Sequence, residues 1–130
     1  MTLVHWFQSS TPHEQIVSTV KTVVSGQAPL QLVVEKEDLF GENKDVLVNR
    51  VSRTDELLQL HNKLVWSLEE IGVVHTNNDW VGDGWNPHVT HKAKSKLLPN
   101  DTFIVDSVSI VCSDDFKHGQ RKLLATISLS

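Results

Sequence analysis

The strongest constraint on the fold is a run of apolar residues at helical spacing in the middle of the chain. These residues recur every three or four positions, at Leu57, Leu60, Leu64, Leu68 and Ile71, which places them on one face of an α-helix. Thr54 stands at the N-cap position, and Gly72 is suited to end the helix. With 130 residues, the chain is long enough to build one domain with a real core around this helix.

A second helical pattern lies nearer the N-terminus. Thr11 and Glu14 have the spacing of a capping box, Pro12 fits the first helical position, and Gly26 suits the stop. Most residues of its apolar stripe are β-branched, which lowers helix propensity, so this helix must rely on packing. The stripe consists of Ile16, Val17, Val20, Val23 and Val24.

Strands are expected on both sides of the two helices. The β-rich segments are residues 2–7, 30–34, 46–51, a strand starting at 88, 103–112 and 123–129. Turns or loops are expected at residues 38–44, 75–86, 99–101 and 114–120. The order strand-helix-strand-strand-helix-strand-strand-strand indicates an α+β fold. With no linker or low-complexity tract, we expect a single domain spanning residues 1–130.

The composition limits the classes of function. Hydrophobic residues make up 39%, charged residues 22%, and the formal net charge is −4. These values are typical of a soluble globular protein and argue against one that coats nucleic acid by bulk electrostatics. They allow local binding of a single phosphate. The sequence shows neither a signal peptide nor a membrane-spanning stretch, so we expect a cytoplasmic protein.

The segment from Trp85 to His91 carries the clearest chemical signal. Pro87 cannot donate to a strand ladder, so it marks where a strand begins. Side chains alternate along a strand, so His88 and Thr90 point the same way. A histidine transfers protons near neutral pH, and a neutral hydroxyl can bind a phosphate beside it. The alternative is an ordinary solvent-facing strand with a β-favouring threonine.

Neighbouring residues are weaker candidates for substrate contacts. Lys92 shares the strand face of His88 and could attract an anionic substrate, or it could simply discourage edge-to-edge aggregation. Trp85 could stack on a nucleobase or pack its loop onto the body of the protein. His88 and His91 are three residues apart and therefore face opposite sides of a strand, which argues against a metal site.

These residues resemble a known family. Trp85-Asn86-Pro87-His88-Val89-Thr90-His91, followed by the strand at 103–111, looks like the second half of a two-histidine (2H) phosphoesterase, the superfamily of 2′-5′ RNA ligase-like (LigT-like) proteins and 2′,3′-cyclic nucleotide phosphodiesterases. Such proteins carry two His-x-Thr/Ser motifs facing each other across a groove. One histidine acts as general base and the other as general acid.

The N-terminus departs from the family pattern. Thr2-Leu3-Val4 resembles the end of the first motif, so its histidine would fall before Met1, and the first strand and helix would be missing. The chain would then be a fragment, a sequence with a misassigned start, or a short form that has lost one catalytic group. His5 cannot replace the first histidine if residues 2–7 form a strand, because it would face away from Thr2.

The resemblance implies a two-lobed α+β fold of antiparallel sheets with external helices around a central groove. It implies a phosphodiesterase acting on 2′,3′-cyclic or 2′-5′ phosphodiesters of RNA ends or nucleotides, without metal or cofactor. His88 and Thr90 would be catalytic, and Thr2, Trp85 and Lys92 would contact substrate. The alternatives are a catalytically silent nucleotide- or RNA-binding module and an interaction domain. If N-terminal elements are truly absent, exposed apolar surface would favour a homodimer.

Overall fold

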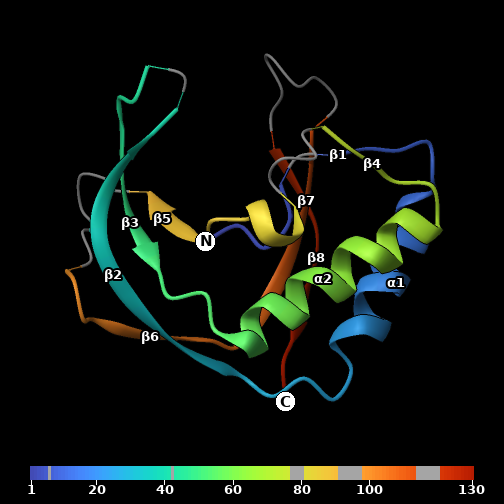
Figure 1. The fold of residues 1–130 in the computed structure, drawn as a ribbon. Helices are drawn as coiled ribbons and strands as arrows, with labels where there is room; N and C mark the ends of the chain where they lie inside the picture. Colours follow the sequence, from blue (N-terminus) through green and yellow to red (C-terminus); the bar gives the residue numbers. More distant parts are fainter. Residues whose placement is uncertain (6, 42, 77–80, 91–97, 114–120) are drawn as a thin grey trace.

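The computed structural model describes residues 1–5, 7–41, 43–76, 81–90, 98–113 and 121–130 (Figure 1). Two helices and eight strands follow one another in these residues, with one short 3₁₀ turn, η2. Their bounds are β1 (Phe7–Gln8), α1 (His13–Val24), β2 (Leu30–Phe40), β3 (Val46–Val51), α2 (Asp55–Glu70), β4 (Val74–His75), η2 (Gly82–Gly84), β5 (His88–Thr90), β6 (Thr102–Val105), β7 (Ser107–Ser113) and β8 (Arg121–Ser128).

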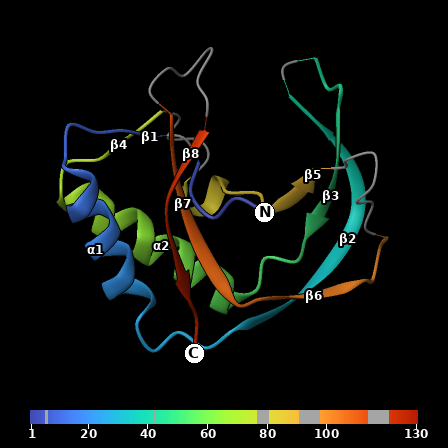
Figure 2. The same cartoon turned by 180° about the vertical axis from the view of Figure 1, so that it is seen from behind.

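The strands form antiparallel sheets, so the predicted α+β class is confirmed. The largest sheet has the order β5-β3-β2-β6 and curls strongly, while β7 pairs with β8 and β1 with β4 (Figures 1 and 2). The helices α1 and α2 pack against each other on one side of the molecule, opposite the curled sheet, and β7 and β8 run between the two sides. Neither helix is long and apolar enough to cross a membrane.

The predicted central helix is confirmed in its details. The Thr54 hydroxyl accepts a hydrogen bond from the Leu57 amide at 3.2 Å and caps the N-terminus of α2. Four leucines of the predicted stripe are buried in one contiguous apolar cluster with residues of α1, β2 and β7. His61 and Trp85, which lie outside that stripe, are also fully buried.

The predicted N-terminal strand is wrong over most of its length. Residues 3 and 4 form a bend, and the first strand described is the two-residue β1, which pairs with the equally short β4. The backbone here bonds to a side chain rather than to a strand: the carbonyl of Leu3 lies 2.6 Å from Nδ1 of His61. A long-range contact therefore overrides the local β propensity.

The predicted capping box of α1 is also wrong. Pro12 occupies the N-cap position and makes no side-chain cap. The Thr11 hydroxyl instead donates to the carbonyl of Ile71 at 2.5 Å, at the C-terminal end of α2. Thr11 thus ties the two helices together rather than capping its own. Gly26 follows the end of α1 with φ of +77°, as a helix stop requires.

Two strand boundaries differ from the sequence pattern. β2 continues to Phe40, so the turn begins at Gly41, later than expected. The strand predicted at 103–112 is divided at Asp106, where the chain leaves the curled sheet as β6 and joins β8 as β7. The Asp106 carbonyl accepts from the Leu129 amide at 2.8 Å across this corner. The predicted loop at 114–120 lies outside the described residues.

Candidate functional site

His88 opens β5, directly after Pro87. The Pro87 carbonyl accepts from the Val51 amide at 2.9 Å, which joins β5 to the end of β3. Nδ1 of His88 lies 2.8 Å from the carbonyl oxygen of Asn86. Because a carbonyl only accepts, Nδ1 carries the proton of this hydrogen bond. Nε2 is therefore the nitrogen of His88 that can exchange a proton with a ligand.

The strand register puts His88 and Thr90 on the same face of the sheet. His88 pairs with Arg50 and Thr90 pairs with Val48 on β3, and directly opposite residues of antiparallel strands share a face. Val89 lies on the other face and packs against the apolar core. His88 is half-buried and Thr90 is exposed. Both side chains therefore lie on the face opposite to the one on which Val89 packs.

Three more side chains form a cluster with His88 on this face. The ring of Phe40 meets the imidazole edge-on, with centroids 4.6 Å apart, and the Arg50 guanidinium lies 5.5 Å from the Phe40 centroid. Nε of Arg50 contacts Oδ2 of Asp38 at 2.6 Å. Hydrogen bonds from Arg50 and from the Leu39 amide lower the pKa of Asp38. The charged carboxylate holds the guanidinium of Arg50, the residue that pairs with His88 in the strand register, near the Phe40 ring.

The N-terminal segment brings a second imidazole to His88. The rings of His5 and His88 are nearly parallel, at 27°, with centroids 6.2 Å apart. The expectation that His5 faces away is wrong, because the segment bends before His5 and strand alternation does not apply to it. Burial is the largest cause that lowers the pKa of His5, and electrostatic interactions with His88 and His61 lower it further. The neutral imidazole is thus favoured at His5.

The remaining predicted contacts fall in different environments. Thr2 is exposed in the same N-terminal segment that carries His5, and the N-terminus is drawn beside the start of β5 (Figure 1). Trp85 is fully buried. Its ring lies flat on His61, with centroids 4.2 Å apart and an angle of 3° between planes, so no face of the indole is open to a nucleobase. Lys92 and His91 lie outside the described residues.

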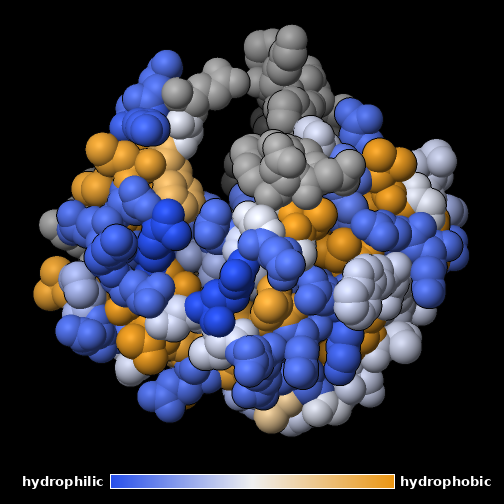
Figure 3. Space-filling view, in the orientation of Figure 1, coloured by the Kyte–Doolittle hydropathy of each residue, from blue (hydrophilic) through white to orange (hydrophobic). Residues whose placement is uncertain are grey.

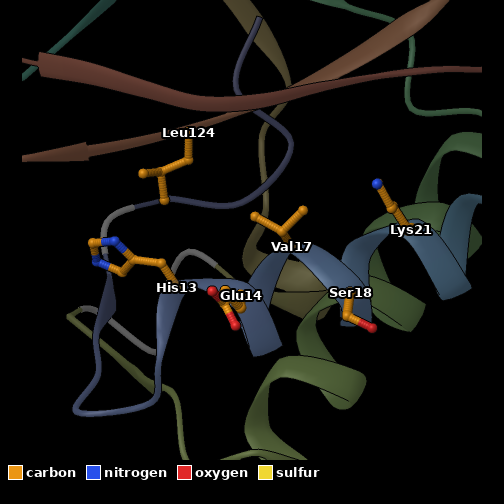
Figure 4. A pocket seen from close by; sticks show the side chains of 6 residues that line it. All are labelled: His13, Glu14, Val17, Ser18, Lys21 and Leu124. Atoms are coloured by element: carbon orange, nitrogen blue, oxygen red, sulfur yellow. The ribbon is translucent and has the colours of Figure 1, made fainter.

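A small hollow in the surface is lined by neighbours of His88 but not by His88 itself. It measures about 190 Å³ and is lined by Glu35, Arg50, Val51, Arg53, Asn86 and Pro87. A larger hollow, about 400 Å³, lies between α1 and β8 and is lined by none of the site residues named above. In Figure 4, His13 and Leu124 flank one end of it, with Lys21 at the other. Its distance from the His88 cluster makes it a poor candidate site.

The space-filling view shows the face of the molecule that is turned toward the reader in Figure 1 (Figure 3). The visible surface is mostly hydrophilic, with apolar patches scattered between. Within the described part of the chain, no three His, Cys, Asp or Glu side chains gather in a way that could hold a metal ion.

Sequence reasoning overlooked Arg50 and Phe40. Their positions, in a strand and at a predicted turn, carry no motif, and their contact with His88 depends on the register of three strands. The one available signal was the position of the charged Arg50 within the mainly apolar strand 46–51. His5 was dismissed because the segment was expected to be extended.

Comparisons with known proteins show what the chain is similar to. Residues 1–110 match the family model described as the 2′-5′ RNA ligase superfamily. Among solved structures, the chain is similar to the crystal structure of TT0787 of Thermus thermophilus, with a TM-score of 0.61 and 19% sequence identity over 93% of this chain and 73% of that one. At this identity the likeness shows the fold alone. A search of curated proteins finds no match.

Proposed function

The chain belongs to the 2′-5′ RNA ligase superfamily, and on this premise we propose that it is a phosphodiesterase acting on 2′,3′-cyclic or 2′-5′ phosphodiesters. The substrates would be RNA ends or small nucleotides. The observation that carries the proposal is the state of His88: Nδ1 is bonded to the Asn86 carbonyl at 2.8 Å. This leaves Nε2 to exchange a proton with a substrate, and the strand register puts His88 on the same face as Thr90.

Hydrolysis of a cyclic phosphodiester needs two proton transfers. The attacking water loses a proton as its oxygen bonds to phosphorus, and the leaving sugar oxygen gains one as its bond to phosphorus breaks. His88 is proposed to carry one of these transfers through Nε2, because imidazole can accept or release a proton near neutral pH. Proton transfer and phosphate binding together require no metal or organic cofactor.

The other residues are proposed to hold the phosphate. Thr90 on β5 and Thr2 on the N-terminal segment, both exposed, are proposed to donate their neutral hydroxyls to it. The Arg50 guanidinium, already oriented by Asp38 at 2.6 Å, adds positive charge next to His88 and would stabilise the anionic oxygens. Lys92 remains a predicted contact to an anionic substrate. A cytoplasmic location, as expected from the sequence, is part of the proposal.

The proposal is tested by following 2′,3′-cyclic AMP by ³¹P NMR in the presence of the protein. We expect conversion to a monophosphate by the unmodified chain and a loss of about 10²–10⁴-fold in rate for His88→Gln. His13→Gln is the matched control, because His13 is exposed at the start of α1. Binding without conversion would replace the enzyme by a catalytically silent binding module, and no phosphorus response at all would contradict both.

A further inference from the structure

A fully buried imidazole on α2 lies behind the candidate site. His61 has no exposed surface, yet both of its ring nitrogens are bonded. Nδ1 lies 2.6 Å from the carbonyl of Leu3, and the amide of Gly82 donates to Nε2 at 3.1 Å. A carbonyl only accepts and an amide N–H only donates, so the ring is the neutral tautomer with its proton on Nδ1.

The two backbone groups held by His61 belong to the two segments that meet at the candidate site. Leu3 lies between Thr2 and His5, and Gly82 opens the turn that leads to His88. The Trp85 indole lies flat against the imidazole, and Nη1 of Arg53 bonds the carbonyl of Trp85 at 2.9 Å. One side chain of α2 thus connects segments that are about 80 residues apart in the sequence.

We propose that His61 is a positioning residue: by holding Leu3 and Gly82 at once, it sets the placement of the N-terminal segment, with His5, against His88. The inference rests on the proposed function only for what the site binds; the placement itself is independent of it. The connections are short, two residues from Leu3 to His5 and six from Gly82 to His88. A displacement at either hydrogen bond is therefore passed on to the rings, which lie 6.2 Å apart.

A merely structural histidine is the competing explanation. Leucines fill the neighbouring positions of the stripe, and a leucine at position 61 would satisfy an apolar core at least as well. It would, however, leave the Leu3 carbonyl and the Gly82 amide without their partners, and buried polar groups without partners are costly. The imidazole is therefore needed to form the two backbone hydrogen bonds rather than to fill the core.

The charged neighbours of His61 favour the neutral ring that this arrangement needs. Burial lowers the pKa of His61, against a raising effect of the Leu3 hydrogen bond, and the positive charges of His75 on β4 and Arg53 before α2 lower it further. His5 on the N-terminal segment interacts electrostatically with His61, which helps to lower the pKa of His5, and Asp83 in η2 is exposed. A second proton on Nε2 would abolish the acceptor for Gly82.

Three substitutions of His61 separate positioning from packing. His61→Leu removes both hydrogen bonds, His61→Asn keeps an amide donor near the place of Nδ1, and His61→Gln brings an amide oxygen near the place of Nε2. His75→Leu is the matched control, because His75 is also a buried histidine but lies on β4. All variants are compared at pH 8 and at a temperature where circular dichroism shows them folded.

The first readout is the nuclear Overhauser contact between the His5 and His88 rings, and the second is the affinity for adenosine 2′-monophosphate. We expect His61→Leu to lose the ring contact and to weaken binding about tenfold or more, with partial recovery in His61→Asn and His61→Gln. We expect His75→Leu to keep both. Should His61→Leu not fold, the Asn and Gln variants, each lacking one hydrogen bond, provide the same comparison.

An unchanged ring contact in the folded His61 variants would overturn the inference. If the ring contact changes as expected but even the unmodified chain fails to bind adenosine 2′-monophosphate, the positioning role stands and the proposed function fails. If binding is unaffected by every substitution of His61 while His88→Gln abolishes it, the function stands and the positioning role is overturned.

Discussion

The two sides of the candidate site are held in place by different means. On the β5 side, His88 and Thr90 belong to a strand that pairs residue by residue with β3. On the N-terminal side, Thr2 and His5 precede the first strand, and the carbonyl of Leu3 between them is bonded to the side chain of His61. A backbone ladder repeats its hydrogen bonds, whereas the N-terminal side depends on a few individual contacts, with His61 foremost.

This difference shows which kind of error sequence reasoning makes. The alternation of side chains along β5 is a property of the local backbone and was correctly anticipated from Pro87 onward. The N-terminal segment has equally high β propensity, but it has no neighbouring strand at residues 2–5 within the described part of the chain. Its path is therefore decided by the residues that it meets in space.

The largest expected effect is a loss of folding stability when the core packing that supports the β5 side is removed. Trp85→Ala removes a fully buried ring, and we expect it to lower the free energy of unfolding by about 3–5 kcal/mol through the cavity that it leaves. Urea denaturation followed by circular dichroism measures the change. Trp66→Ala is the control, because Trp66 is 60% exposed on α2 and its removal should cost less than about 0.5 kcal/mol. Equal effects at both positions would contradict the packing described for Trp85.

A smaller loss of folding stability is expected when the hydrogen bond between Thr11 and the C-terminal end of α2 is removed. Thr11→Val removes the hydroxyl that bonds the Ile71 carbonyl at 2.5 Å and should cost about 1 kcal/mol of folding free energy. Thr11→Ser keeps the hydroxyl and should retain most of that stability. The comparison fails if both variants unfold at the same urea concentration.

Phe40 allows a finer test on the β5 side. Phe40→Leu removes the ring that meets His88 edge-on at 4.6 Å, and we expect a loss of only about 0.5 kcal/mol in unfolding free energy. The imidazole resonances of His88 should shift in the proton NMR spectrum, while those of His13 should not. Unchanged His88 resonances would show that the two rings are not in contact.

The smallest expected effect is the loss of folding stability on acidification from pH 8 to pH 5. Burial lowers the pKa of both His5 and His61 in the folded chain, so below about pH 6.5 the unfolded state binds protons more readily. The stability present above that pH should therefore fall as the pH decreases toward the lowered values. Urea midpoints between pH 8 and pH 5 measure this, and His61→Gln should flatten the dependence. An equal slope in the variant would exclude His61 as a source.

The helix α2 shows which features can be predicted from residues that are close in sequence. Its leucine stripe, its cap at Thr54 and its end near Gly72 were all predicted from residues close in sequence, and they are all observed. The cap predicted for α1 failed because Thr11 found a partner 60 positions away. Local rules describe the bonds that a residue can make nearby, but not a competing bond offered by another element.

The candidate site divides in the same way. Its histidine and threonine on β5 could be named from four consecutive residues, since a strand alternates its faces wherever it lies. Arg50 and Phe40 could not be named, because their meeting with His88 depends on which strands pair and in what register. Trp85 was offered as a substrate contact or a packing residue, and its burial against His61 favours the second.

The sequence by itself determined the α+β class, the central amphipathic helix, the shared face of His88 and Thr90, and the resemblance to the family. All of these depend on periodicity or on short motifs, which act over a few residues. Only the tertiary structure decided that His5 lies against His88 and that His61 joins Leu3 to Gly82. These contacts bring distant segments together, and their energy comes from burying and pairing groups that no local pattern connects.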